Sequence, residues 1–150
     1  MASIKSRLYN IKNKQKKYAD SDYSFEIEFD QSSFVTWYMK TRDKQKNCCK
    51  YCGVNQDDID KLVESGIISS KRFSKRGGSL EIERIDPNGP YSEDNCVLVC
   101  YFCNNDKSDI ISREDYESFF CVKDKESGLT QRQKWISHLL KKEKIGSASE

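Results

Sequence analysis

Two Cys-x-x-Cys pairs lie far apart in the chain and have the spacing of a metal site. Cys49 and Cys52 form the first pair, and Cys100 and Cys103 form the second. Each such turn presents two sulfurs to one ion, and tetrahedral zinc takes four thiolates, so the pattern indicates a structural Zn²⁺ site. Four buried, reduced cysteines are the alternative. Of the seven cysteines, Cys48 directly precedes the first pair and is the residue that would most readily replace a predicted ligand.

Two oxygen-bearing side chains lie close to this pattern. Glu83 stands near the end of a predicted strand, and Asn104 directly follows the last predicted zinc ligand. A hard divalent cation prefers a carboxylate and an amide carbonyl, with water and a substrate phosphate as its other ligands. A hairpin packed on the helix that carries Asn104 would bring the two side chains together. The alternative is that both are surface residues, as Glu and Asn near turns usually are.

The local sequence pattern predicts the elements that must position these side chains. Apolar residues at helical spacing indicate helices over about 3–19, 31–42, 55–66, 103–110, 112–120 and 131–144. Alternating patterns indicate short strands over 23–29, 79–85 and 96–100. The expected class is α+β. We expect a basic helical N-terminal extension over 1–46, a core over 47–112, C-terminal helices over 113–145 and a disordered tail over 146–150.

The composition describes a small and polar domain. The chain has 150 residues, of which 36% are hydrophobic and 33% are charged. Such a small core often needs a staple, and a metal would serve as one. No apolar run approaches the roughly 20 residues of a membrane span, and no apolar segment resembles a signal peptide. We therefore expect a cytoplasmic protein with reduced cysteines and no membrane partner.

The charges are segregated along the chain although the net charge is only +2. Basic residues gather at 5–17, 40–50, 71–76 and 141–144, whereas acidic residues gather at 20–30. Separate basic clusters suit the phosphate backbone of a nucleic acid. The alternative is that these clusters are the solvated faces of lysine-rich helices.

The stretch from Ser79 to Asp109 resembles the HNH nuclease family, the ββα-metal endonucleases, and especially its zinc-containing branch from phages and mobile elements. The usual family pattern is Cys-x-x-Cys, a strand ending in Asp-His-Ile-x-Pro, an Asn, and Cys-x-x-Cys-(Asn/His)-x-x-Lys. This chain has Cys49-x-x-Cys52, Glu83-Arg84-Ile85-Asp86-Pro87, Asn95 and Cys100-x-x-Cys103-Asn104-x-x-Lys107. The resemblance covers about residues 47–109. It implies a small ββα-metal core with a four-cysteine zinc site, flanked by N- and C-terminal helices.

The resemblance also implies a function and a set of site residues. Glu83 and Asn104 would hold a catalytic Mg²⁺ or Mn²⁺. Asn95 would hold the loop between the strands by backbone hydrogen bonds, and Lys107 would lie near a phosphate or support the helix. The implied activity is metal-dependent hydrolysis of DNA phosphodiester bonds, by nicking or by double-strand cleavage. The implied partner is double-stranded DNA, and a homodimer is compatible because a double-strand cut usually needs two active sites.

Arg84 departs from the family pattern, which places a histidine as general base directly after the metal carboxylate. A guanidinium stays protonated and has only donors, so Arg84 cannot accept a proton, although it can hold a phosphate with two hydrogen bonds. Three interpretations stay open. The base is another residue, with Asp86 the first candidate and Tyr91 and His138 weaker ones; the metal activates water with little help; or the protein is a zinc-stapled DNA-binding protein with an inactivated site. A zinc-containing domain that binds proteins is a further alternative.

Overall fold

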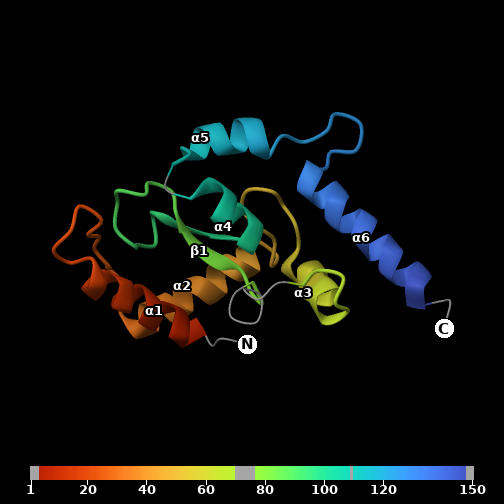
Figure 1. Cartoon of the computed structure of the whole chain (residues 1–150). Coiled ribbons are helices and arrows are strands. Elements are labelled where there is room, and N and C mark those ends of the chain that lie inside the picture. The colour runs from red at the N-terminus through yellow and green to blue at the C-terminus, as the bar shows by residue number, and fades with distance from the viewer. Residues whose placement is uncertain (1–3, 70–76, 109, 148–150) are drawn as a thin grey trace.

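The computed structural model describes residues 4–69, 77–108 and 110–147. The described elements are, in chain order, α1 (Ile4–Lys17), α2 (Gln31–Lys44), α3 (Gln56–Glu64), β1 (Glu81–Arg84), β2 (Cys96–Val99), α4 (Tyr101–Lys107), α5 (Arg113–Asp115), the π-helical turn η1 (Tyr116–Phe120) and α6 (Gln131–Ser147). Helices surround one small antiparallel sheet of two strands (Figure 1). The predicted α+β class is confirmed.

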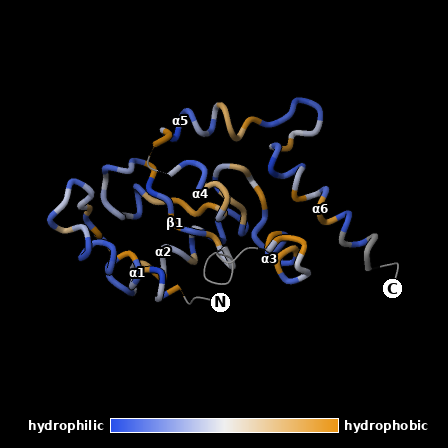
Figure 2. The backbone as a smooth tube through the Cα atoms, in the orientation of Figure 1, coloured by the Kyte–Doolittle hydropathy of each residue, from blue (hydrophilic) through white to orange (hydrophobic). Residues whose placement is uncertain are grey.

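The β1–β2 hairpin and α4 form the centre of the molecule. The antiparallel register places Glu81 opposite Val99 and Glu83 opposite Val97. Because side chains alternate along a strand, Glu81 and Glu83 share one face of β1, while Arg84 belongs to the other. α4 begins at Tyr101, two residues earlier than predicted, because Cys100 caps it, and it ends at Lys107 because Ser108 adopts a φ of +46°. Figure 2 shows hydrophobic stretches beside β1 and α4, and others on α3 and α6.

The N-terminal helices pack against the start of this hairpin. The Asp30 carboxylate caps α2 by accepting hydrogen bonds from the backbone N–H groups of two serines in the first turn. The apolar side of α2 buries Phe34, Trp37 and Tyr38. The Tyr38 hydroxyl donates to the backbone carbonyl of Leu80 over 2.7 Å. α2 is therefore attached directly to the residue that precedes β1.

The strand predicted over 23–29 is reduced to a single bridge. Ile27 pairs with Tyr91, which lies in the loop between β1 and β2. The Tyr91 N–H donates to Glu26 O over 2.8 Å, and Tyr91 O accepts from the Glu28 N–H over 3.0 Å. The prediction of a strand was wrong because the partner of this alternating segment is a loop residue, which offers no ladder to extend.

The C-terminal helix α6 begins against the first Cys-x-x-Cys turn. The Thr130 hydroxyl donates to Cys52 O over 2.7 Å, and Gln133 Nε2 donates to Gly53 O over 3.0 Å. Arg132 forms an ion pair with Asp106 of α4. α6 continues to Ser147, so residues 146–147 are helical where a disordered tail was expected. Residues 148–150 and the basic cluster at 71–76 lie outside the described residues.

Within the described ranges, no helix is both long enough and apolar enough to cross a membrane.

Candidate metal centre and active site

The four cysteines of the two Cys-x-x-Cys pairs meet in the interior. Their sulfurs all lie within 4.8 Å of one another, and all four residues are buried. The sulfurs of Cys52 and Cys100 are 3.7 Å apart. A tetrahedral zinc ion with Zn–S bonds of about 2.3 Å would separate its sulfurs by about 3.8 Å. The cluster therefore fits one tetrahedral metal ion, and it joins the first pair to the end of β2.

The other three cysteines lie outside this cluster. Cys48 is half-buried, and its sulfur contacts Lys46 O and the Asn55 amide instead. Cys96 is buried in β2, where burial raises the pKa of its thiol to about 12. Cys121 is buried beside Cys103, and the interaction with that sulfur raises the pKa of the Cys121 thiol. Cys48, which could have replaced a ligand on sequence grounds, is not among the four converging sulfurs.

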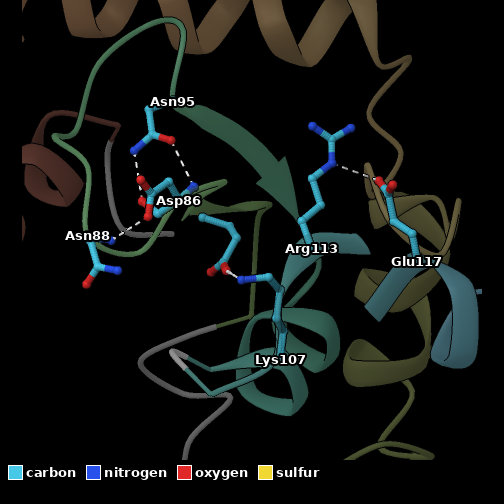
Figure 3. Close-up of polar contacts among 7 residues, drawn as sticks. Asp86, Asn88, Asn95, Lys107, Arg113 and Glu117 are labelled. Atoms are coloured by element: carbon cyan, nitrogen blue, oxygen red, sulfur yellow. Dashed lines mark hydrogen bonds and ion pairs between the residues drawn. The ribbon is translucent and has the colours of Figure 1, made fainter. Parts of the chain in front are cut away.

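Two polar contacts connect β1 to α4. Lys107 Nζ donates to Glu83 Oε1 over 2.9 Å, and the lysine side chain is fully buried. Asn104 Nδ2 donates to Glu81 Oε2 over 2.5 Å. Glu81 and Glu83 share one face of β1, and Asn104 and Lys107 lie about one turn apart on α4, so the two contacts stand side by side. Glu83 and Asn104 thus lie in one cluster, but they contact different residues: Glu83 contacts Lys107, and Asn104 contacts Glu81. Figure 3 shows the Lys107 contact.

The cluster suits a hard divalent cation. Glu83 offers a carboxylate and Asn104 an amide carbonyl, which are oxygen ligands that Mg²⁺ and Mn²⁺ prefer, and a second carboxylate, that of Glu81, contacts the Asn104 amide. Lys107 pairs with Glu83, which is one of these two carboxylates. Oxygen donors of this kind suit a hard cation.

Asn95 organises the loop between the strands. Its Oδ1 accepts from the Asp86 N–H over 2.9 Å, while its Nδ2 donates to Asp86 O over 3.0 Å and to Pro90 O over 2.9 Å (Figure 3). Gly89 packs closely on the same amide, since a Cβ at Gly89 would lie 2.7 Å from Asn95 Nδ2. These contacts fix the path of the backbone directly after β1.

Arg84 lies between two aromatic rings. The centre of its guanidinium is 4.8 Å from the Tyr91 ring centroid and 5.2 Å from that of Phe25. Its Nη1 donates to Gly89 O over 3.0 Å. Stacking on aromatic faces holds a guanidinium in one orientation. Arg84 is therefore a fixed positive charge at the loop, on the strand face opposite to Glu83.

The three candidate bases occupy different environments. β1 ends at Arg84, so Asp86 lies in the turn that follows the strand. Its carboxylate accepts from the Asn88 N–H over 2.9 Å (Figure 3). Tyr91 packs on Arg84 and Phe25. His138 is exposed on α6, and α6 packs against α3.

Sequence reasoning missed two residues of this region. Glu81 is buried and contacts Asn104, and its alternation with Glu83 along the strand was the available signal. Tyr51 is buried inside the first Cys-x-x-Cys turn, and its hydroxyl has no hydrogen bond among the described residues. Burial, with a smaller effect of the Glu83 charge, raises the pKa of Tyr51, so this phenol keeps its proton. No sequence signal placed Tyr51 near Glu83.

Comparison with known proteins identifies the fold as HNH-like. The structure is similar to that of the rare-cutting HNH restriction endonuclease PacI, with a TM-score of 0.59 and 21% identity, over 79% of this chain and 74% of that chain. The sequence is 32% identical over 84 residues to the SPbeta prophage-derived putative HNH endonuclease YoqL of Bacillus subtilis (strain 168). That match covers 56% of this chain and 33% of YoqL, so the chain spans about a third of its relative's length. No protein-family model matches the chain. The two similarities confirm the HNH resemblance.

Proposed function

We propose that this protein is a metal-dependent DNA endonuclease of the HNH type, which hydrolyses phosphodiester bonds. The observation that carries the proposal is the cluster between β1 and α4, in which Asn104 contacts Glu81 and Lys107 contacts Glu83. This cluster stands directly on the four-cysteine site, because Asn104 follows the last of the four cysteines. A metal-stapled frame of this kind keeps the oxygen ligands in place although the domain is small.

Two kinds of metal ion are proposed. Zn²⁺ would occupy the four thiolates and stabilise the fold. Mg²⁺ or Mn²⁺ would be held by Glu83 and Asn104, where it would stabilise negative charge on the phosphate and its leaving oxygen. The other roles in the reaction are proposed for protein side chains.

Arg84 and Lys107 are proposed to have different roles. Arg84 would bind a phosphate oxygen through the part of its guanidinium that does not donate to Gly89. Lys107 would hold the Glu83 carboxylate in position, because its ammonium is already paired in the interior. Asn95 would position the loop that carries Asp86, which remains the first candidate for the general base. Asp86 lies in the turn after β1, where its carboxylate could receive a proton from water.

The proposed substrate is double-stranded DNA in the cytoplasm of the host cell. The exposed lysines of α1 and the basic residues that end α2 would contact flanking phosphates. Cleavage of both strands would require either two binding events or a homodimer with two active sites.

A second candidate function is DNA binding without cleavage. Arg84 favours it, because this residue occupies the position of the usual base and cannot accept a proton. The two functions are separated by incubating zinc-loaded protein with supercoiled plasmid at low salt, with Mg²⁺, Mn²⁺ or EDTA. Nicked or linear product only with a divalent cation supports the endonuclease. Salt-sensitive binding with intact plasmid in every cation supports the binding protein.

A further inference from the structure

Glu81 contacts the amide of Asn104 from an unusual position. Glu81 is only 4% exposed. It is the first residue of β1 and lies on the same face of the strand as Glu83. The distance from Asn104 Nδ2 to Glu81 Oε2 is 2.5 Å, which is the close approach of a strong, charge-assisted hydrogen bond. Burial of a carboxylate is costly unless it is hydrogen-bonded, and the Asn104 amide supplies one such hydrogen bond.

This contact sets which end of the amide faces Glu81. An ionised carboxylate only accepts hydrogen bonds, whereas an asparagine amide has a donor end and an acceptor end. The NH₂ end must therefore face Glu81, and the carbonyl Oδ1 must point elsewhere. Asn104 is half-buried, and among the described residues no donor is hydrogen-bonded to its Oδ1. The amide thus keeps its oxygen available for a ligand.

The orientation matters because the two ends of an amide have nearly the same shape. Without a partner, the group could rotate by a half turn and present its NH₂ to a cation, which would repel it. We infer that Glu81 is a positioning residue that holds Asn104 Oδ1 toward the divalent cation. This inference rests on the proposed function, because it concerns the same cation site. Outer partners that orient a metal ligand typically change metal affinity by about 10–100-fold.

Two substitutions separate orientation from charge. Glu81→Leu has a similar size and no acceptor. Glu81→Gln removes the charge but keeps an acceptor for the Asn104 NH₂. If Glu81 acted only through its charge, both variants would lose the same affinity. If it orients the amide, Glu81→Gln retains more affinity than Glu81→Leu.

The test measures Mn²⁺ binding by electron paramagnetic resonance in the zinc-loaded protein, in the wild type and in an Asn104→Ala background. Glu114→Leu, an exposed glutamate on α5, is the matched control. We expect Glu81→Leu to raise the Kd by about 10–100-fold. We expect Glu81→Gln to raise it by less than about a third of that factor, and neither variant to add to the effect of Asn104→Ala. The side-chain NH₂ signals of Asn104 in ¹⁵N NMR spectra should shift in Glu81→Leu before any Mn²⁺ is added.

Each contrary result identifies what fails. An unchanged Kd in Glu81→Leu, or unchanged Asn104 signals, would overturn the positioning role. A loss that persists in the Asn104→Ala background would make Glu81 a direct ligand and also overturn it. Absence of Mn²⁺ binding in the wild type would remove the proposed cation site and the inference together. Folding is checked by the charge-transfer bands of cobalt bound to the four cysteines. If Glu81→Leu lacks these bands, the Mn²⁺ Kd of Glu81→Gln is compared with that of the wild type instead.

Discussion

Lys107 and Glu83 form an ion pair in the interior, with 2.9 Å between Nζ and Oε1 and a lysine side chain that has no exposed surface. The pair joins the last turn of α4 to β1. A buried ammonium is tolerated only with a close counter-charge, so this contact fixes the spacing between the helix and the strand that carry the proposed site.

Lys107→Met is expected to destabilise the protein strongly. The substitution keeps the aliphatic stem and removes the charge, which leaves the buried Glu83 carboxylate without its ammonium. Loss of one partner of a buried pair typically costs about 3–5 kcal/mol. Urea unfolding of the zinc-loaded protein measures this change. Arg113→Met removes the partly exposed pair with Glu117 and should cost less than about 1 kcal/mol; equal losses in the two variants would contradict the interior role of Lys107.

Asn95→Ala is expected to loosen the loop between β1 and β2. Three hydrogen bonds to the Asp86 and Pro90 backbone are lost, and an unsatisfied group typically costs about 1–3 kcal/mol. Hydrogen exchange of the backbone amides over 86–91 should become faster. The control is Asn88→Ala, whose exposed side chain lies at the tip of the same turn. Unchanged exchange in Asn95→Ala would show that the loop is held by other contacts.

The two variants of Arg84 are expected to differ in cleavage. Arg84→Ala removes a fixed positive charge from the loop and should slow plasmid cleavage by about 10²-fold, the usual effect of one lost electrostatic contact to the reacting group. Arg84→His adds a group that can accept a proton and should cleave faster than Arg84→Ala. Equal losses in both variants would mean that a histidine here supplies no base and that the guanidinium itself is required.

The assignment of the four cysteine ligands predicts which cysteine substitutions release metal. The purified protein should contain about one zinc ion per chain by elemental analysis. Cys52→Ser should lose it and unfold at lower urea concentration, because structural metal binding contributes directly to folding. Cys48→Ser should retain the metal, since its sulfur lies outside the cluster. Retention by Cys52→Ser together with loss by Cys48→Ser would reverse the assignment.

The sequence predicted those parts of the site that depend on local spacing. The Cys-x-x-Cys turns, the hairpin and the helix after Cys100 follow from short-range patterns, and the structure has them. The sequence could not predict which glutamate contacts Asn104, because this depends on how α4 lies over β1. Likewise, the stacking of Arg84 on Phe25 depends on the N-terminal segment, distant along the chain, passing beside Tyr91. The alternating pattern of residues 23–29 predicted a strand, but it could not reveal that this segment pairs with a loop residue.

The central claim is that Glu83 and Asn104 form a cation-dependent site that cleaves DNA. Its most direct test is the rate of plasmid nicking by the zinc-loaded protein during Mg²⁺ and Mn²⁺ titration. Glu83→Ala and Asn104→Ala are compared with the wild type, and the exposed residues Glu114→Ala and Asn105→Ala serve as matched controls. We predict saturable, cation-dependent nicking that each site variant lowers by about 10³-fold, equivalent to several kcal/mol of lost transition-state stabilisation, while the controls keep the wild-type rate. Wild-type rates in both Glu83→Ala and Asn104→Ala would contradict the account.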